Sequence, residues 1–324
     1  MEIADTRPRT VLVIGALGQI GQELTAGLRS RYGTGRVIAS DVRLPAHAEG
    51  PFVQLDALDA EGLTELLRQE QVTEVYHLAA MLSAKGEQHP LQAWDINMRS
   101  LLIALEAARG TGVRRMFWPS SIAAFGPGTP HDGAPQHTVM DPSTVYGISK
   151  LAGEHWCAYY AARYGLDVRS LRYPGLISYK TPPGGGTTDY AVHIFHAAVT
   201  EETYTSFLGP DTRLPMMYMP DAIRATIELM EAPAEQVRVR TSYNLQGFSF
   251  TPAELAAAIQ RRLPSFTVQY APDFREAIAA SWPASMDDQA AREDWGWAPA
   301  YTLDAMVDEM LAQIRLQYPA VLPS

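Results

Sequence analysis

Tyr146 and Lys150 stand four residues apart in the segment 144–150 (TVYGISK). On a helix this spacing places both side chains on the same face. A free tyrosine hydroxyl has a pKa of ~10 and is a poor base at neutral pH, but a neighbouring ammonium stabilises the phenolate and lowers that pKa. We therefore expect this pair to take a proton from an alcohol while a hydride leaves the adjoining carbon.

A second chemical feature is the glycine spacing Gly15, Gly18 and Gly21, which follows the apolar run 10–15 and precedes an expected helix. In that context the glycines permit a tight turn, close approach of a pyrophosphate and packing of the helix on the strand. Asp41 stands 20 residues after Gly21, where a carboxylate binds both hydroxyls of an adenosine ribose and repels a 2′-phosphate. The pattern predicts NAD rather than NADP, with Arg43 as a mild counter-signal.

Further cofactor contacts are expected around this turn and at the ends of other strands, because open α/β sheets bind ligands at their carboxyl edge. Each of these residues alone is equally compatible with ordinary packing. The positions are Gln19, Ile20, Val42, Arg43, Asp56, Ala57, Leu78, Ala79, Ala80 and Leu176.

Alternating strands and helices must position these groups. Strands are expected at 10–15, 36–40, 74–78, 115–118 and 167–171, and helices at 19–32, 58–69, 91–109 and 144–164. Repeated βα units predict a parallel sheet with right-handed crossovers. After residue 173 the pattern changes, with helices expected at 220–231, 251–262 and 301–317 and a strand at 242–245.

We therefore predict an α/β protein with two intimately associated parts. Residues 1–173 plus about 217–246 form an NAD-binding, Rossmann-type doubly wound parallel sheet. Residues from about 174 to 216 plus 247–324 form a smaller, discontinuous C-terminal substrate-binding domain.

The composition excludes several classes of protein. The net charge of −10 over 324 residues argues against a nucleic-acid partner. No apolar run approaches the roughly 18 residues that span a bilayer, and the polar segment 1–10 lacks the apolar core of a signal peptide. The single cysteine, Cys157, excludes an intrachain disulfide and a cysteine-cluster metal site. We expect a cytoplasmic protein without membrane contacts.

Three motifs now resemble the extended short-chain dehydrogenase/reductase superfamily, which includes nucleotide-sugar epimerases and dehydratases. They are Gly-x-x-Gly-x-x-Gly, the segment 120–126 (SSIAAFG) and Tyr-x-x-x-Lys. The resemblance implies that Ser121 hydrogen-bonds the reacting oxygen, that Tyr146 is the acid/base, and that Lys150 supports it and binds the nicotinamide ribose. It also places Asn97, on the central helix, with the cofactor-binding residues.

Within this superfamily, the segments 81–87, 170–180, 183–190 and 211–221 resemble the short-chain type of L-threonine 3-dehydrogenases, and the likeness spans about 10–315. It implies metal-free, NAD-dependent oxidation of L-threonine at its β-carbon to L-2-amino-3-oxobutanoate, a step of threonine catabolism towards glycine or aminoacetone. The alternative is an NAD-dependent nucleotide-sugar epimerase or dehydratase, against which Pro174 and Gly175 argue. An NAD-sensing scaffold is disfavoured by the intact Ser–Tyr–Lys set.

A threonine substrate needs donors for its carboxylate, an acceptor for its ammonium and a catalytic group at its alcohol. Asp189 is expected to face the ammonium, with the alternative that Thr188 or Asp189 caps a helix beginning near Tyr190. The expected substrate-binding residues are Ser83, Ser121, Tyr146, Gly184, Thr187 and Asp189.

Two further expectations concern metals and assembly. His193 and His196 share a helix face but lack a third ligand, so no metal is expected. A homodimer is expected through the helices at 91–109 and 144–164, where Trp94 and Trp156 suit an interface.

Overall fold

The computed structural model describes residues 7–182, 184–201 and 203–318. Three stretches named in the sequence analysis lie outside this description. They are residues 1–6 of the polar N-terminal segment, Pro183 of the glycine-rich segment, and residues 319–324 of the expected smaller domain. Among the described helices, none has the length and apolar character needed to cross a bilayer.

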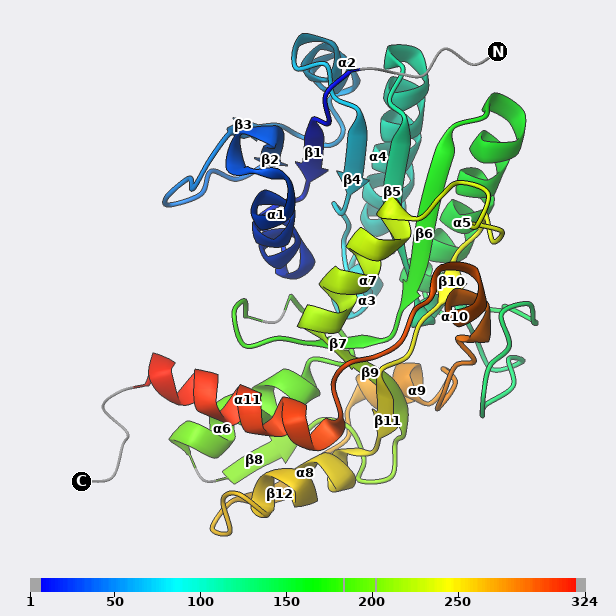
Figure 1. The fold of residues 1–324 in the computed structure, drawn as a ribbon. Coiled ribbons are helices and arrows are strands. Elements are labelled where there is room, and N and C mark those ends of the chain that lie inside the picture. Colours follow the sequence, from blue (N-terminus) through cyan, green and yellow to red (C-terminus); the bar gives the residue numbers. More distant parts are fainter. Residues whose placement is uncertain (1–6, 183, 202, 319–324) are drawn as a thin grey trace.

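A seven-stranded parallel sheet forms the centre of the larger part (Figure 1). The strand order is β10-β6-β5-β4-β1-β2-β3, so the direction of winding reverses between β1 and β4. Ligands of doubly wound sheets bind at that reversal, beyond the carboxyl ends of the strands. The predicted Rossmann-type fold is confirmed. The strands are β1 (Val11–Ile14), β2 (Val37–Asp41), β3 (Phe52–Gln54), β4 (Glu74–His77), β5 (Arg115–Ser121), β6 (Asp167–Tyr173) and β10 (Tyr243–Asn244).

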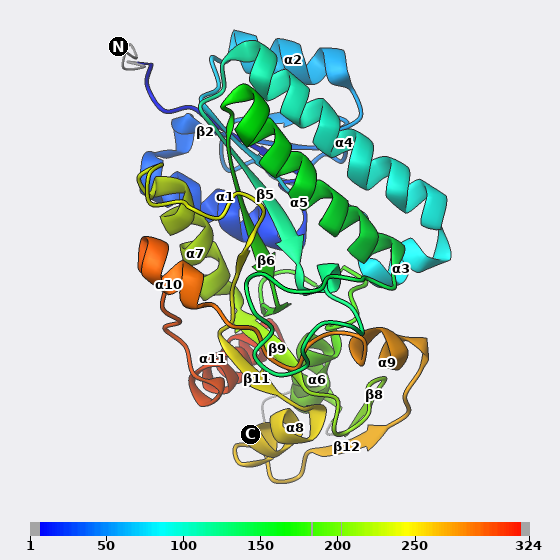
Figure 2. The same cartoon turned by 90° about the vertical axis from the view of Figure 1, so that its right-hand side faces the viewer.

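Helices cover both faces of this sheet because its buried strands are apolar on both sides. Val11 and Val13 of β1 belong to one core, and Leu12 and Ile14 to the other. Figures 1 and 2 show α1 and α7 on the first face and α2, α4 and α5 on the second. Their bounds are α1 (Gln19–Tyr32), α2 (Ala60–Gln69), α4 (Pro90–Thr111), α5 (Val145–Tyr164) and α7 (Met219–Glu231), with the short α3 (Ser83–Gln88), η1 (Thr34–Arg36) and η2 (Ile122–Ala124) between them.

The smaller part lies beyond the carboxyl ends of the large sheet and has its own apolar core, which includes Tyr190, Phe195 and Ile314 (Figure 1). It holds a three-stranded sheet in the order β11-β9-β7 and the parallel pair β8 and β12. Its elements are β7 (Gly175–Ile177), α6 (Tyr190–Thr200), β8 (Thr203–Ser206), β9 (Leu214–Tyr218), β11 (Phe248–Phe250), α8 (Pro252–Gln260), β12 (Thr267–Tyr270), α9 (Phe274–Ala279) and α11 (Leu303–Gln317). Helix α10 (Gln289–Trp295) packs beside β10 of the large sheet.

The two parts are more interwoven than the expected boundaries suggest. Strand β9 runs across the expected boundary at residue 217. Ala291 and Trp297, which fall in the expected smaller domain, pack in the core between the large sheet and α1 and α7. The expected residue limits of a cofactor-binding and a substrate-binding domain therefore stay a prediction.

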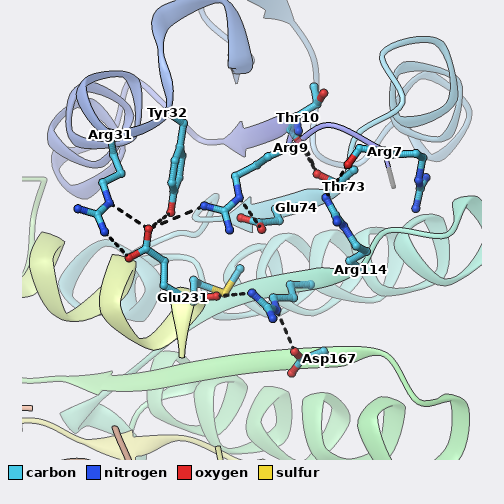
Figure 3. Close-up of polar contacts among 12 residues, drawn as sticks. Arg7, Arg9, Thr10, Arg31, Tyr32, Thr73, Glu74, Arg114, Asp167 and Glu231 are labelled. Atoms are coloured by element: carbon cyan, nitrogen blue, oxygen red, sulfur yellow. Dashed lines mark hydrogen bonds and ion pairs between the residues drawn. The ribbon is translucent and has the colours of Figure 1, made fainter. Parts of the chain in front are cut away.

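Ion pairs join the helices and strands at the amino ends of the large sheet (Figure 3). The carboxylate of Glu231, at the end of α7, accepts hydrogen bonds from Arg31 (3.0 and 2.8 Å) and from the Tyr32 hydroxyl (2.9 Å) on α1. Arg9 pairs with Glu74 at 3.1 Å, which joins the start of β1 to the start of β4. These contacts join the elements at the end of the sheet opposite the carboxyl ends of its strands.

Candidate active site

The glycine turn between β1 and α1 is built for close backbone approach. Gly15 has φ +83°, and a Cβ there would lie 2.8 Å from the Ala79 amide nitrogen. A Cβ on Gly21 would overlap the Gly15 carbonyl oxygen. Gly18 precedes the helix without a side-chain cap, so the first amides of α1 stay free of side chains. Gln19 Nε2 is buried without a hydrogen-bond partner among the described residues. These features fit the diphosphate of a dinucleotide.

Asp41 ends β2 beside this turn. Its Oδ2 accepts the Leu17 amide at 3.0 Å, and its Oδ1 accepts the Arg43 amide at 3.1 Å and Arg43 Nε at 3.2 Å. Because the Arg43 guanidinium is paired with this carboxylate, it is a weaker signal for a 2′-phosphate than the sequence alone suggests. Val42, between them, is exposed on the surface beside the turn.

The other expected cofactor residues differ in how closely they approach the turn. Ala79 abuts Gly15, and the Leu78 amide donates to the Ile14 carbonyl at 2.8 Å. Leu176 is half-buried against the core that α1 and α7 share. The exposed Asp56 carboxylate instead accepts the Leu58 amide at 2.9 Å, in the turn before α2. Ile20, Ala57 and Ala80 are half-buried.

Helix α5 brings the catalytic candidates together. Its N-cap, Thr144, accepts the Gly147 amide at 3.0 Å. A Cβ on Gly147 would overlap the Ala123 carbonyl oxygen, so this glycine lets the helix press against the turn that follows β5. As a result, the Tyr146 hydroxyl lies close enough to Ser121, at the end of β5, for Ser121 to oppose the rise of its pKa.

Lys150 lies on the same face of α5, one turn beyond Tyr146. Its Nζ donates to the Pro119 carbonyl at 2.6 Å and lies 5.4 Å from the centre of the Tyr146 ring. Burial raises the pKa of Tyr146 to about 12, opposed by the hydrogen bond from Ser121. Burial also lowers the pKa of Lys150 to about 7. The pKa of Tyr146 in the free enzyme is therefore raised and not lowered, because desolvation is the largest contribution to it. The support of Tyr146 by Lys150 during the reaction stays a prediction.

Asn97 of α4 acts as a clamp between segments. Its Oδ1 accepts the Met81 amide at 2.7 Å, and its Nδ2 donates to the Met81 carbonyl at 3.1 Å and to Ser149 Oγ at 3.2 Å. Ser149 in turn donates to the Tyr146 carbonyl at 2.7 Å. Asn97 therefore holds the segment after β4 against the catalytic helix, and its expected contact with the cofactor stays a prediction.

Two of the expected substrate residues meet although 104 positions separate them. The hydroxyls of Ser83 and Thr187 are 3.2 Å apart, and both side chains are buried. Gly184 lies next to them in the fold, since a Cβ there would be 3.0 Å from Leu82 Cδ1. The segments 81–87 and 184–190 are thus brought together, and the first of them reaches the start of α5, where Glu87 Oε1 accepts the Val145 amide at 2.8 Å.

Asp189 organises the glycine stretch that precedes it. Its Oδ2 accepts the amides of Gly185 (2.9 Å) and Gly186 (2.7 Å). It occupies the N-cap position of α6 but makes no side-chain bond to the amides of that helix. The alternative of an ordinary side-chain cap is therefore wrong, because the carboxylate is turned back to the loop. Burial raises its pKa and these two amides oppose the rise. Its contact with a substrate ammonium stays a prediction.

Sequence reasoning missed a buried ionic group beneath the site. Arg172 of β6 donates to Glu154 of α5 through Nε (2.8 Å) and Nη2 (2.7 Å), and Ser120 Oγ donates to the same carboxylate at 2.6 Å. Arg172 Nη1 also donates to Asn244 Oδ1 at 3.0 Å. The available signal was Glu154, which continues the four-residue spacing of Tyr146 and Lys150 by one turn.

The two histidines of α6 show no metal-like grouping. His196 Nδ1 lies 3.2 Å from the Tyr318 hydroxyl. Over residues 7–182, 184–201 and 203–318, no three His, Cys, Asp or Glu side chains come close enough to share a metal ion.

This combination of turn and catalytic helix matches a known family. The model of the NAD dependent epimerase/dehydratase family matches residues 11–245. The chain belongs to this family. Its cofactor is NAD, and the cradle at Gly15, Gly18 and Gly21 would hold the diphosphate, with Asp41 at the ribose.

Relatives of this family member are similar over nearly the whole chain. An uncharacterized epimerase/dehydratase of Staphylococcus aureus (strain USA300) is 47% identical over 95% of this chain and 97% of its own length. The holo form of a GalE-like L-threonine dehydrogenase from Cupriavidus necator is 59% identical, covers 94% and 99% of the two chains and has a TM-score of 0.93. A monomeric L-threonine 3-dehydrogenase from a metagenome is 44% identical over 95% and 99%, also with a TM-score of 0.93.

The sugar-nucleotide branch is more distant. A UDP-glucose 4-epimerase from Thermotoga maritima is 22% identical, covers 95% and 99% of the two chains and has a TM-score of 0.84. This likeness shows the common fold and carries no argument about substrate.

Proposed function

We propose that this enzyme oxidises L-threonine at the β-carbon to L-2-amino-3-oxobutanoate with NAD, in the cytoplasm and as a step of threonine breakdown. The observation that carries the proposal is the Ser83–Thr187 contact, which sets two hydroxyls together at the start of α3, the helix whose Glu87 meets the start of the Tyr146 helix. Small donors of this kind suit the carboxylate of an amino acid. The similarity to enzymes named L-threonine dehydrogenases supports the same substrate.

In the proposed mechanism, Ser121 and Tyr146, which lie close together, hold the substrate hydroxyl between their own hydroxyls. Tyr146 removes the hydroxyl proton as the C–O bond gains double-bond character and the hydrogen on the β-carbon leaves with its electron pair. NAD, when bound, supplies the acceptor for that hydride. Lys150 balances the charge on Tyr146, and the burial of Lys150 excludes water from its side of the half-buried Tyr146.

A substrate panel tests this proposal. The purified full-length protein with NAD is supplied separately with L-threonine, L-serine, L-allo-threonine and UDP-galactose, and NADH formation is followed by absorbance. We expect L-threonine to give the highest kcat/KM. Inactivity on L-threonine would overturn the proposal, and turnover of UDP-galactose, detected as UDP-glucose, would favour the nucleotide-sugar alternative.

Replacing Thr187 with valine should raise the KM for L-threonine about three- to tenfold, since one net hydrogen bond contributes about 0.5–1.5 kcal/mol. The change keeps the shape of the side chain and removes only the hydroxyl that faces Ser83. Steady-state kinetics with saturating NAD measure the effect, and Thr64→Val on the exposed side of α2 serves as the control. An effect on the NAD Kd alone would remove Thr187 from the substrate pocket.

Replacing Asp41 with alanine should weaken NAD binding roughly tenfold to a hundredfold, because hydrogen bonds to charged groups contribute about 1.5–3 kcal/mol. NADP binding should change less, since the carboxylate repels a 2′-phosphate. Asp41→Asn is the matched control, because its remaining oxygen still accepts the Leu17 amide that Asp41 bonds at 3.0 Å. Calorimetric titration with both cofactors measures the preference, and an unchanged NAD/NADP ratio in the alanine variant would contradict the ribose role.

We also propose a homodimer through α4 and α5. Trp94 is 41% exposed and Trp156 is 39% exposed, and Leu91, Ile148 and Tyr159 on the same helices are exposed too. Apolar side chains grouped in this way favour a protein contact. Light scattering after gel filtration should give twice the 35.6 kDa chain mass, and Trp156→Asp should give the single-chain mass. A wild-type protein that runs as a single chain, as the monomeric relative is described, would refute the dimer.

A further inference from the structure

Lys150 occupies an unusual place for an ammonium group. Its side chain is 3% exposed, and no salt bridge to it is present within the described residues. Nζ instead lies 4.4 Å from the centre of the Trp118 indole ring and donates to the Pro119 carbonyl at 2.6 Å. An aromatic face and a backbone carbonyl from the same strand therefore take the place of a carboxylate.

A glycine on the facing helix α5 makes room for the indole ring. Trp118 is a buried residue of β5, and Gly153 of α5 lies opposite its ring. A Cβ on Gly153 would lie 2.6 Å from the ring atom Cζ2 and 3.0 Å from Leu101 Cδ2, so any side chain there would displace the ring. Gly153 follows Lys150 by three residues and so shares its helix face. The two positions together open the space in which the ring meets the ammonium.

The other titratable groups near Lys150 leave this contact as its main electrostatic partner. Glu154 on α5 is already paired with Arg172 of β6 at 2.7 Å. Burial raises the pKa of the Cys157 thiol, so it stays protonated, and burial lowers the pKa of His77 on β4 to about 3, so its imidazole is neutral. Tyr146 is also protonated at neutral pH. The charge of Glu154 also favours the protonated form of Lys150, but the ring face and the carbonyl are the groups that contact the ammonium directly.

We propose that Trp118 is a positioning residue for Lys150: its indole face and the Pro119 carbonyl hold the ammonium at the inner side of α5, on the same face as Tyr146. A ring quadrupole attracts a cation most strongly where water is excluded. The role of Lys150 in catalysis rests on the proposed function. The contact itself is a property of the chain without substrate or cofactor.

The scarcity of lysine makes this contact measurable. The chain has only Lys85, Lys150 and Lys180, and the first and last of these are exposed. Full-length, cofactor-free protein labelled with ¹³C at lysine Cε should give three lysine signals in its NMR spectrum. The signal that disappears in Lys150→Arg is that of Lys150. We expect that signal to be shifted upfield by the ring current of Trp118. Its pH midpoint should lie near 7, because burial lowers the pKa of Lys150 to about that value.

Variants at position 118 separate the aromatic face from simple filling of the core. Trp118→Leu should abolish the upfield shift and lower the midpoint of Lys150 further, by roughly half a unit or more, because the charged form loses its partner. Trp118→Phe, which keeps a weaker ring face, should be intermediate. Trp282→Leu, which removes an equally buried indole outside the site, should leave both values unchanged.

A Lys150 signal in Trp118→Leu with the wild-type shift and midpoint would overturn the proposal. If the leucine variant does not fold, Gly153→Ala gives the same test with every aromatic residue present, because the added methyl must move the ring away from Lys150. An unchanged Lys150 signal in folded Gly153→Ala would equally overturn it. Neither NAD nor threonine is used, so a chain inactive on threonine could still show the contact, and a threonine-active chain could still lack it.

Discussion

Replacing Tyr146 with phenylalanine should lower kcat for L-threonine oxidation about 10²- to 10⁴-fold, the usual contribution of a positioned general acid–base. The substitution keeps the packing of the ring and removes only the hydroxyl that lies close to Ser121. NAD binding should persist, because the glycine turn and Asp41 are untouched. Near-wild-type turnover would remove Tyr146 from the chemistry.

The pH dependence of the wild-type enzyme gives a second measure of the same group. Only the phenolate accepts a proton, and burial raises the pKa of Tyr146 in the free enzyme to about 12. The phenolate fraction grows as pH rises, while loss of the Lys150 proton above about pH 7 offsets that gain, so kcat/KM should rise up to about pH 7 and then level off. In Tyr146→Phe the residual kcat/KM should lose this rise. A wild-type profile that falls from pH 7 upward would contradict the assignment.

Replacing Arg172 with methionine should lower the free energy of unfolding by about 3–5 kcal/mol, the usual cost of removing one partner from a buried ion pair. The change leaves the Glu154 carboxylate, which is 1% exposed, with Ser120 as its remaining side-chain partner. Chemical denaturation measures the loss. The loss of stability should be accompanied by lower kcat/KM. Ser120 precedes Ser121, and the positions of both depend on the packing of β5 against α5.

A double variant identifies the cause of that loss. Glu154→Gln combined with Arg172→Met removes both charges, so it should recover a substantial part of the stability lost in the single variant. The control is Arg99→Met on α4. Arg99 pairs with Asp95 at 3.0 Å on the solvent-exposed side of that helix, so its loss should change the free energy of unfolding by less than about 1 kcal/mol. Equal losses in the single and double variants would show that shape, and not the unpaired charge, sets the cost.

Elements with strong local signals could be predicted closely from sequence. Helix α1 has the predicted bounds, Gln19–Tyr32, because a glycine stands immediately before it and another immediately after it. Strand β5 runs three residues beyond the prediction, to Ser121, since its pairing with β6 continues through Pro119. Short strands such as β8, β11 and β12 were not predicted, because three or four residues carry no usable periodicity.

The site could be predicted where chemistry depends on spacing along one element. The shared face of Tyr146 and Lys150 follows from a four-residue step, and the glycine turn follows from a strand and a helix on either side. The contact between Ser83 and Thr187 and the clamp by Asn97 depend on distant segments meeting. The pKa values of Tyr146 and Lys150 depend on burial, which a single sequence does not specify.

The central claim, that a hydride leaves the β-carbon of threonine for NAD, is tested most directly with L-[3-²H]threonine. The wild-type protein is incubated with this substrate and NAD, and the reduced cofactor is isolated and examined by proton NMR. We predict deuterium at C4 of the nicotinamide ring, with slower turnover than for unlabelled threonine when hydride transfer limits the rate. Unlabelled NADH formed from the deuterated substrate, or no reduced cofactor at all, would contradict the account.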